Sequence, residues 1–200
     1  ELAMYHDGNR SLQDRFDSRR IADRLVEVLH RVRFTAEDRE FIEGRSMFFL
    51  ATADAGGWPD CSYKGGRPGF VRVIEDDVLA FPSYDGNGMF KSLGNLLANP
   101  RVGMLFMDFA QPKRLRVNGT ASIDFSDPLL GSFEGAQLVV RVRAEHIFPN
   151  CPRYIHRMTL EEISVYAPAT GPQPPTPAWK EMEAFRDYLP RAPHDDPAVD

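Results

Sequence analysis

The chain has 200 residues, a formal net charge of -5, 42% apolar residues and 26% charged residues. This composition is typical of a globular protein with a sizeable core, and it excludes collagen-like, disordered and disulfide-scaffold classes. The acidic balance argues against nucleic acid as the main partner, because phosphate binding needs a basic surface. No apolar run approaches the ~20 residues of a membrane span, and the first residues lack the basic-then-apolar pattern of a secretion signal. The two cysteines lie far apart in the sequence, so we expect a cytoplasmic protein without a disulfide framework.

Residues 1–34 are predicted to be a helical extension. Residues 1–16 are polar, and we expect them to be loose. From Asp17 onward, apolar residues recur at the spacing of one helix face, which predicts an amphipathic helix. These residues are Ile21, Leu25, Val28, Leu29 and Val32. The arginine-rich opposite face is interpreted as solvated.

Residues 35–166 are predicted to form one domain rich in β-strands. It begins with a short helix, because Thr35 and Asp38 form a capping-box pattern and Gly44 is a typical stop. Strands are expected at 46–53, 59–64, 70–74, 78–81, 102–108, 115–123 and 138–148. Further helices are expected at 89–97, 127–135 and 151–158. Strands at hairpin spacing, with few helices between them, predict an antiparallel barrel rather than a doubly wound parallel sheet.

Residues 167–200 are predicted to be a C-terminal extension. The stretch 167–177 contains five prolines, which is typical of an extended linker. A last short helix is expected at 179–189, and the tail from Arg191 is expected to be disordered.

The common catalytic and nucleotide-binding signatures do not occur in the sequence. It contains no glycine-rich dinucleotide or P-loop motif, no HExxH, no CxxC and no GxSxG. The five histidines show no metal-ligand spacing, so we predict no metal site and no Asp-His-Ser triad.

Two lysines stand beside glycine-rich loops. Lys64 ends a predicted strand just before Gly65 and Gly66, and Lys91 opens a predicted helix after the loop 86–88. A helix N-terminus attracts anions because its backbone N–H groups are free, and a lysine there adds charge. A phosphate site at Lys91 is therefore one interpretation, and a surface lysine after a flexible turn is the other.

Four segments in a fixed order resemble the pyridoxamine 5′-phosphate oxidase-like family of FMN-binding split-barrel proteins. They are FLATADAGGWP at 49–59, GFV at 69–71, NLLANPRVG at 95–103 and RVNGTA at 116–121. The resemblance covers about residues 35–165. Further segments, such as HIFPNC at 146–151, are more similar to a bacterial branch than to the vitamin-pathway oxidase. The resemblance implies a mostly β fold with flanking helices, a split antiparallel β-barrel, and a homodimer that shares its FMN sites across the interface.

The resemblance also implies which residues hold FMN. They are Ser62, Tyr63, Lys64, Phe81, Pro82, Ser83, Asn87, Phe90, Lys91, Arg114 and Arg116. Lys91 matches the phosphate lysine of the family, while Phe90 replaces its arginine neighbour. Arg114 replaces a glutamine that reaches the flavin from the partner subunit. The family's C-terminal Arg/His substrate cluster is not evident, which puts pyridoxal-type substrates in doubt.

The function that the resemblance implies is an FMN-dependent oxidoreductase acting on a small organic substrate. The flavin would carry the redox chemistry, which accounts for the missing catalytic motifs, and no catalytic residue is predicted. The alternatives are a flavin-storage or flavin-sensing protein without turnover, and a split barrel that uses deazaflavin or haem.

Four further residues carry open roles. Cys61, in mid-strand, is predicted to be a small buried hydrophobe, and Cys151, in a turn, is interpreted as structural rather than reactive. Arg153 and His156 are candidates for the edge of a substrate pocket.

Overall fold

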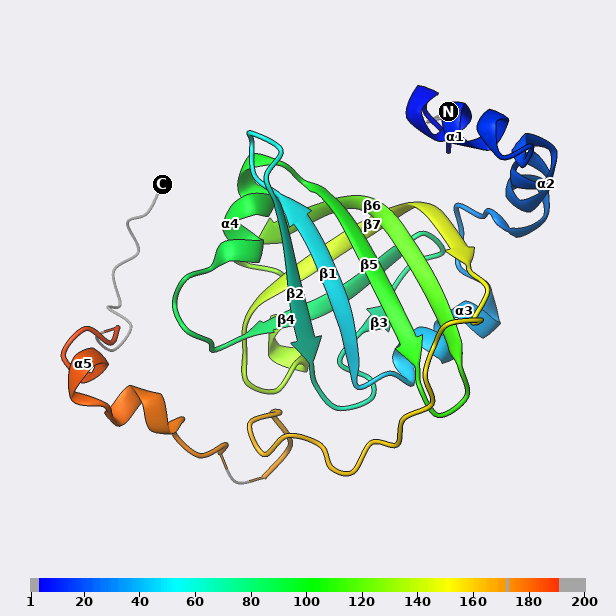
Figure 1. Ribbon diagram of the computed structural model, residues 1–200. Coiled ribbons are helices and arrows are strands. Elements are labelled where there is room, and N and C mark those ends of the chain that lie inside the picture. Colours follow the sequence, from blue (N-terminus) through cyan, green and yellow to red (C-terminus); the bar gives the residue numbers. More distant parts are fainter. Residues whose placement is uncertain (1–3, 172, 191–200) are drawn as a thin grey trace.

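The computed structural model describes residues 4–171 and 173–190. Its centre is one seven-stranded antiparallel sheet in the order β2-β1-β5-β6-β7-β4-β3, curled into a split barrel (Figure 1). The strands are β1 (Met47–Ala53), β2 (Pro59–Gly65), β3 (Arg72–Val73), β4 (Val78–Tyr84), β5 (Arg101–Asp108), β6 (Lys113–Asp124) and β7 (Ala136–Pro149). The predicted antiparallel split barrel is confirmed.

Helices lie at the rim of the barrel and at the two ends of the chain. They are α1 (Asp7–Arg15), α2 (Arg19–Leu29), α3 (Ala36–Glu43), α4 (Lys91–Ala98) and α5 (Glu183–Arg186), with 3-10 turns η1 (Leu130–Ser132) and η2 (Ala178–Glu181). In the described part of the chain, no helix combines the length and apolarity needed to cross a membrane.

An aromatic cluster fills the middle of the barrel. The ring of Phe48 lies 5.0 Å from that of Phe81, 5.2 Å from Phe106 and 5.9 Å from Phe70. All four side chains are buried. Because aromatic rings bury large apolar areas, this cluster ties β1, β4 and β5 into one core.

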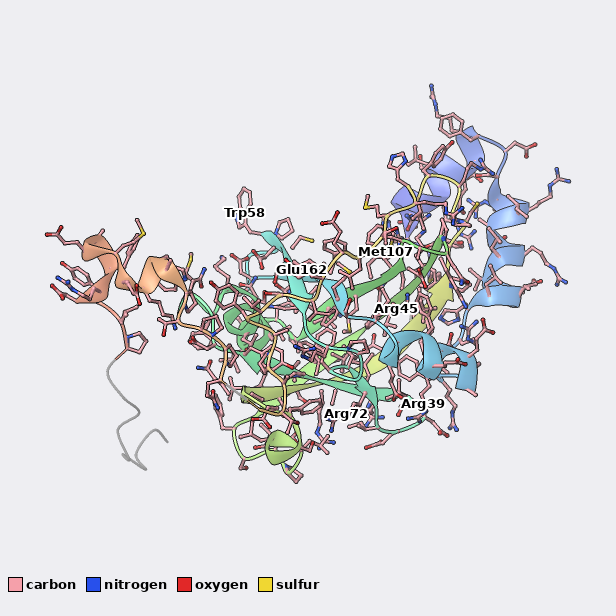
Figure 2. The ribbon with its side chains drawn as sticks, turned by 90° about the horizontal axis from the view of Figure 1, so that it is seen from below. Arg39, Arg45, Trp58, Arg72, Met107 and Glu162 are labelled. Atoms are coloured by element: carbon pink, nitrogen blue, oxygen red, sulfur yellow. The ribbon has the colours of Figure 1, made fainter. Side chains whose placement is uncertain are left out.

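Sequence-local chemistry fixes the connections. In the β1–β2 turn, the Asp54 carboxylate accepts hydrogen bonds from the N–H groups of Gly56 and Trp58, and Gly57 adopts φ +85°. Trp58 projects from this turn away from the barrel (Figure 2). The predicted capping box of α3 is confirmed, since Thr35 and Asp38 exchange hydrogen bonds of 3.0 and 3.1 Å.

Gly119 occupies the tightest point between two strands. The register of β6 against β7 shifts at Asn118/Gly119, and a Cβ added at Gly119 would lie 2.0 Å from the Arg143 carbonyl oxygen. This close approach explains why a glycine stands in the RVNG segment.

Several element predictions were wrong. The stretch 7–15 is not loose, because it forms α1, and the ring of its N-cap residue His6 accepts a hydrogen bond from the Gly8 N–H. Residues 151–158 form no helix, because the chain makes one turn at Pro152 and Met158 then donates its N–H to Phe109 on the barrel. The helix expected at 127–135 is only η1, although the Asp127 carboxylate accepts a hydrogen bond from the Leu129 N–H as a helix cap would.

Other predictions were right in kind but not in extent. The strand expected at 70–74 pairs only over β3, and the helix expected at 179–189 is divided into η2 and α5. The apolar stripe of α2 faces solvent instead of a core, with Ile21 57% and Val28 57% exposed. Cys61 is exposed rather than buried, because β2 is an edge strand. The tail predicted to be disordered lies outside the described residues.

Candidate functional site

Two adjoining cavities lie between the ends of β2 and β4 and the start of α4. The first, here called the strand cavity, measures about 370 Å³ and is lined by Lys64, Phe81 and Ser83 from the strands and by residues 160–167 from the segment after β7. The second, the helix cavity, measures about 350 Å³ and includes Asn87 and Lys91. Each volume falls in the range of small-molecule sites.

The two cavities share one wall. Lys64, Ser83, Tyr84, Gly86 and Leu93 line both of them. A ligand longer than either cavity can therefore extend through both. One end would lie among strand residues and the other at the helix.

Lys64 is the cation at the junction. It is half-buried at the end of β2, opposite Phe48 of β1. Burial lowers the pKa of its ammonium below the usual range, and the nearby Asp60 carboxylate partly opposes this shift. Among the described residues, no carboxylate forms an ion pair with Lys64. A partly desolvated, unpaired ammonium is suited to bind an acceptor atom of a ligand.

The glycines after Lys64 make room for aromatic neighbours. A Cβ added at Gly66 would lie 2.5 Å from the Phe70 ring, and one at Gly65 would lie 2.7 Å from the Tyr63 ring. The Gly65-Gly66 pair therefore allows the Tyr63 and Phe70 rings to line the strand cavity.

The start of α4 opens into the helix cavity. Phe90 takes a left-handed conformation at the N-cap, and no side chain caps the helix. Lys91 is the first helical residue, so its ammonium and the free N–H groups of the first turn both favour an anion. The Asp60 carboxylate is an opposing charge, held 3.4 Å from the Ser92 hydroxyl that donates to it.

Packing fixes α4 in this position. Its Leu93 and Leu96 side chains are buried in the core, and the Asn95 amide donates a 3.0 Å hydrogen bond to the buried Thr52 hydroxyl of β1. The anion-binding end of α4 is therefore attached to the barrel by a satisfied polar contact as well as by apolar burial.

Most of the predicted site residues lie together. The cavities gather Ser62, Tyr63, Lys64, Phe81, Pro82, Ser83, Asn87, Phe90 and Lys91. Arg114 and Arg116 of β6 do not line either cavity. Arg114 donates a 2.9 Å hydrogen bond to the Cys151 carbonyl, and its Nε is buried without a partner among the described residues.

Sequence reasoning missed the segment after β7. Leu160, Glu162, Ile163, Ser164 and Tyr166 line the strand cavity. This segment has no periodicity or motif that ties it to the site, so no sequence signal could have found it. Arg153 and His156, the residues proposed from this region, are exposed and line neither cavity.

Sequence reasoning also missed a histidine pair. The ring nitrogens Nε2 of His30 and Nδ1 of His146 lie 2.8 Å apart and join the end of α2 to β7. Within the ranges that the structure describes, no group of three or more His, Cys, Asp or Glu side chains is placed to hold a metal ion. The pair is one contact between the N-terminal helices and the barrel.

Comparison with known proteins identifies the family. Residues 34–166 match the sequence model of the pyridoxamine 5′-phosphate oxidase family. Because this match spans more than half of the sequence, the chain belongs to that family. A search of curated proteins found no significant match.

Solved structures with a related fold have low identity to this chain. HupZ from Group A Streptococcus is 22% identical, with a TM-score of 0.47 over 58% of this chain and 93% of that one. An FMN-binding protein from Syntrophomonas wolfei is 15% identical, with a TM-score of 0.44 over 71% and 96%. The haem storage protein HutZ from Vibrio cholerae is 22% identical, with a TM-score of 0.43 over 58% and 95%. The family assignment rests on the match to residues 34–166.

Proposed function

We propose that this protein is a cytoplasmic FMN-dependent oxidoreductase that acts on a small organic substrate. The observation that carries the proposal is the junction of the two cavities at Lys64 and Ser83. FMN has the matching shape, since a flat ring and a phosphate are joined by a flexible chain.

The residues present fit both ends of FMN. A phosphate carries nearly two negative charges, which suit Lys91 and the uncapped start of α4. The flat ring suits the strand cavity, where Tyr84 and Tyr166 offer apolar surface.

When bound, FMN supplies the redox chemistry. Lys64 and Ser83, which line both cavities, would hold it: the Lys64 ammonium would supply positive charge near the ring, and the Ser83 hydroxyl would supply a hydrogen bond. The segment 160–167 covers the strand cavity and reduces its contact with water.

The proposal includes a homodimer whose partner supplies Arg114. Arg114 and Arg116 lie away from the cavities of their own copy, and the buried Arg114 Nε lacks a partner among the described residues. In a two-fold dimer, the same surface of each copy forms the interface. Arg114 of one copy can therefore reach the cavities of the other.

A second candidate is a protein that binds flavin without turning over a substrate. It is favoured by the position of Arg153 and His156, which lie outside both cavities and leave no evident substrate-gripping cluster. Haem is a further alternative, because tyrosine can ligate haem iron and Tyr84 and Tyr166 line the strand cavity. Deazaflavin remains the alternative that mass spectrometry of the released ligand distinguishes from FMN.

Titration of flavins into ligand-free protein tests the proposal. Lys91→Met keeps most of the aliphatic stem and removes the charge, so FMN affinity should fall about ten- to a hundredfold. Riboflavin, which lacks the phosphate, should lose much less. Lys64→Met should weaken both flavins alike, because the contact proposed for Lys64 is with the ring and not with the phosphate.

The control is Lys113→Met, which removes a surface lysine paired with Glu37 outside both cavities. Equal losses for FMN and riboflavin in Lys91→Met would place the phosphate elsewhere. A wild-type protein that is colourless and takes up no FMN would contradict the proposed function itself. Consumption of a reductant or substrate by the FMN-loaded protein separates an enzyme from a flavin-binding protein.

A further inference from the structure

The strand cavity has one wall that does not belong to the barrel. This wall is the segment Met158–Pro168, here called the strap, which contributes Leu160, Ile163 and Tyr166 among others. Figure 2 shows the chain after β7 crossing one face of the barrel, with Glu162 labelled on it. The opposite wall is formed by the ends of β2 and β4.

Two contacts anchor the strap at its ends. At the first, the Met158 N–H donates a 3.1 Å hydrogen bond to the Phe109 carbonyl. At the second, Pro168 packs over Gly135, where an added Cβ would lie 2.9 Å from the proline ring. Gly135 adopts φ +69°, so the position favours glycine both for its backbone and for the space above it.

Between these anchors, the strap is weakly attached. In the described chain, the hydrogen bonds made by backbone groups of residues 159–167 run from the Ala167 N–H to the Ser164 carbonyl and from the Tyr166 N–H to the Ser164 hydroxyl, both inside the strap itself. Leu160 is 63% exposed and Tyr166 is 48% exposed. A segment with few hydrogen bonds to the barrel and little buried apolar area opens at low free energy.

We infer that the strap is part of the ligand site and that its opening controls ligand exchange, with Gly135 and Pro168 as positioning residues. The inference rests on the proposed function for the identity of the ligand, a flat organic ring in the strand cavity. The ring would contact Leu160, Ile163 and Tyr166 on the strap side. Displacing Pro168 would then loosen this wall without touching any residue of the opposite one.

The test compares two glycine substitutions with the same backbone strain. Gly135→Ala forces a Cβ against Pro168, whereas Gly57→Ala, at φ +85°, meets no atom within 4 Å. Relative to Gly57→Ala, the dissociation rate of riboflavin from Gly135→Ala should rise about five- to tenfold, which corresponds to the lower end of the cost of overpacking. Amide hydrogen exchange in residues 159–167 should accelerate by a similar factor in the ligand-free protein.

Amide hydrogen exchange in the ligand-free protein tests the anchoring of the strap independently of whether the ligand is a flavin. If the wild-type protein binds no flavin but exchange accelerates only in Gly135→Ala, the anchoring of the strap holds while its link to ligand exchange and the proposed function both fail. Equal exchange and equal riboflavin dissociation in the two variants would overturn the inference. A second variant, Pro168→Ala, removes the ring atoms beyond Cβ from the same contact and should also speed dissociation, without any left-handed strain.

Discussion

The seven-stranded sheet and the two ends of the chain are held together by different interactions. In the sheet, side chains such as Phe48, Leu50 and Phe106 are fully buried, and each strand from β2 to β3 is hydrogen-bonded to the next in the sheet order. In the N-terminal helices α1 and α2, Ala22 is the one buried residue among those that the structure describes, and the apolar stripe of α2 faces solvent. The family match begins at residue 34 and ends at residue 166, so it follows the sheet and leaves most of both ends outside.

Ion pairs show the same difference. In the sheet region, Asp127 is buried and receives two hydrogen bonds from Arg141, at 2.6 and 2.9 Å. In the N-terminal helices, pairs such as Arg24–Glu27 are exposed, and exposed pairs contribute little to stability. The sheet therefore carries the stability and places the site, while the ends are free to vary in what they cover or contact.

The largest expected effect tests the sheet at its tightest point. Gly119→Ala places a Cβ 2.0 Å from the Arg143 carbonyl oxygen. This oxygen belongs to the backbone of β7, so it cannot move away from the clash as a flexible side chain would. We expect a loss of about 3 kcal/mol or more in the free energy of unfolding, measured by denaturant titration. Gly94→Ala is the control, since an added Cβ there meets nothing within 4 Å and alanine favours the helix interior. An unchanged denaturation midpoint for Gly119→Ala would contradict the close approach of β6 and β7 at this residue.

Sequence alone predicted what depends on neighbouring residues. The α3 capping box and the position of Lys91 at a helix start follow from local chemistry, and both are confirmed. The gathering of Lys64 with Phe81 and Ser83 came from the family resemblance, because it joins strands that local patterns cannot pair.

What sequence could not predict depends on contacts between distant segments. His30 and His146 are 116 residues apart, and neither has a neighbouring pattern that names the other. The strap lies against the site because Met158 contacts the Phe109 carbonyl and Pro168 packs over Gly135. A backbone carbonyl and a single glycine have no sequence motif that would predict these contacts. The apolar stripe of α2 is a different case. Its periodicity correctly predicts an apolar helix face, but it does not tell whether that face is covered, and here it faces solvent.

A middle effect is expected from Asp127 and should depend on pH. Hydrogen bonds from Arg141 hold the pKa of the Asp127 carboxyl below its usual range. The pair therefore stabilises the fold above the unfolded-state pKa, near 3.9, and this contribution is lost as the pH falls through the lower folded-state pKa. At pH 7, Asp127→Asn should cost about 2 kcal/mol, and the difference from wild type should shrink below pH 4. Unfolding titrations at both pH values measure this, and a pH-independent difference would mean that the cost arises from packing rather than charge.

The smallest effect is expected in the N-terminal helices. Leu25 is 46% exposed on the α2 stripe, and glutamine has a helix propensity close to that of leucine. Leu25→Gln should therefore change the free energy of unfolding by less than about 0.5 kcal/mol. In contrast, Leu50→Ala in the buried part of β1 should cost about 2–5 kcal/mol.

Light scattering of both FMN-loaded proteins, wild type and Leu25→Gln, should give the mass of a dimer, because the proposed shared sites involve the barrel and not α2. A dimer for wild type but a monomer for Leu25→Gln would mean that a second copy covers the α2 stripe, and stability would then depend on protein concentration. A monomer for both proteins would remove the proposed role of Arg114 in the partner's site.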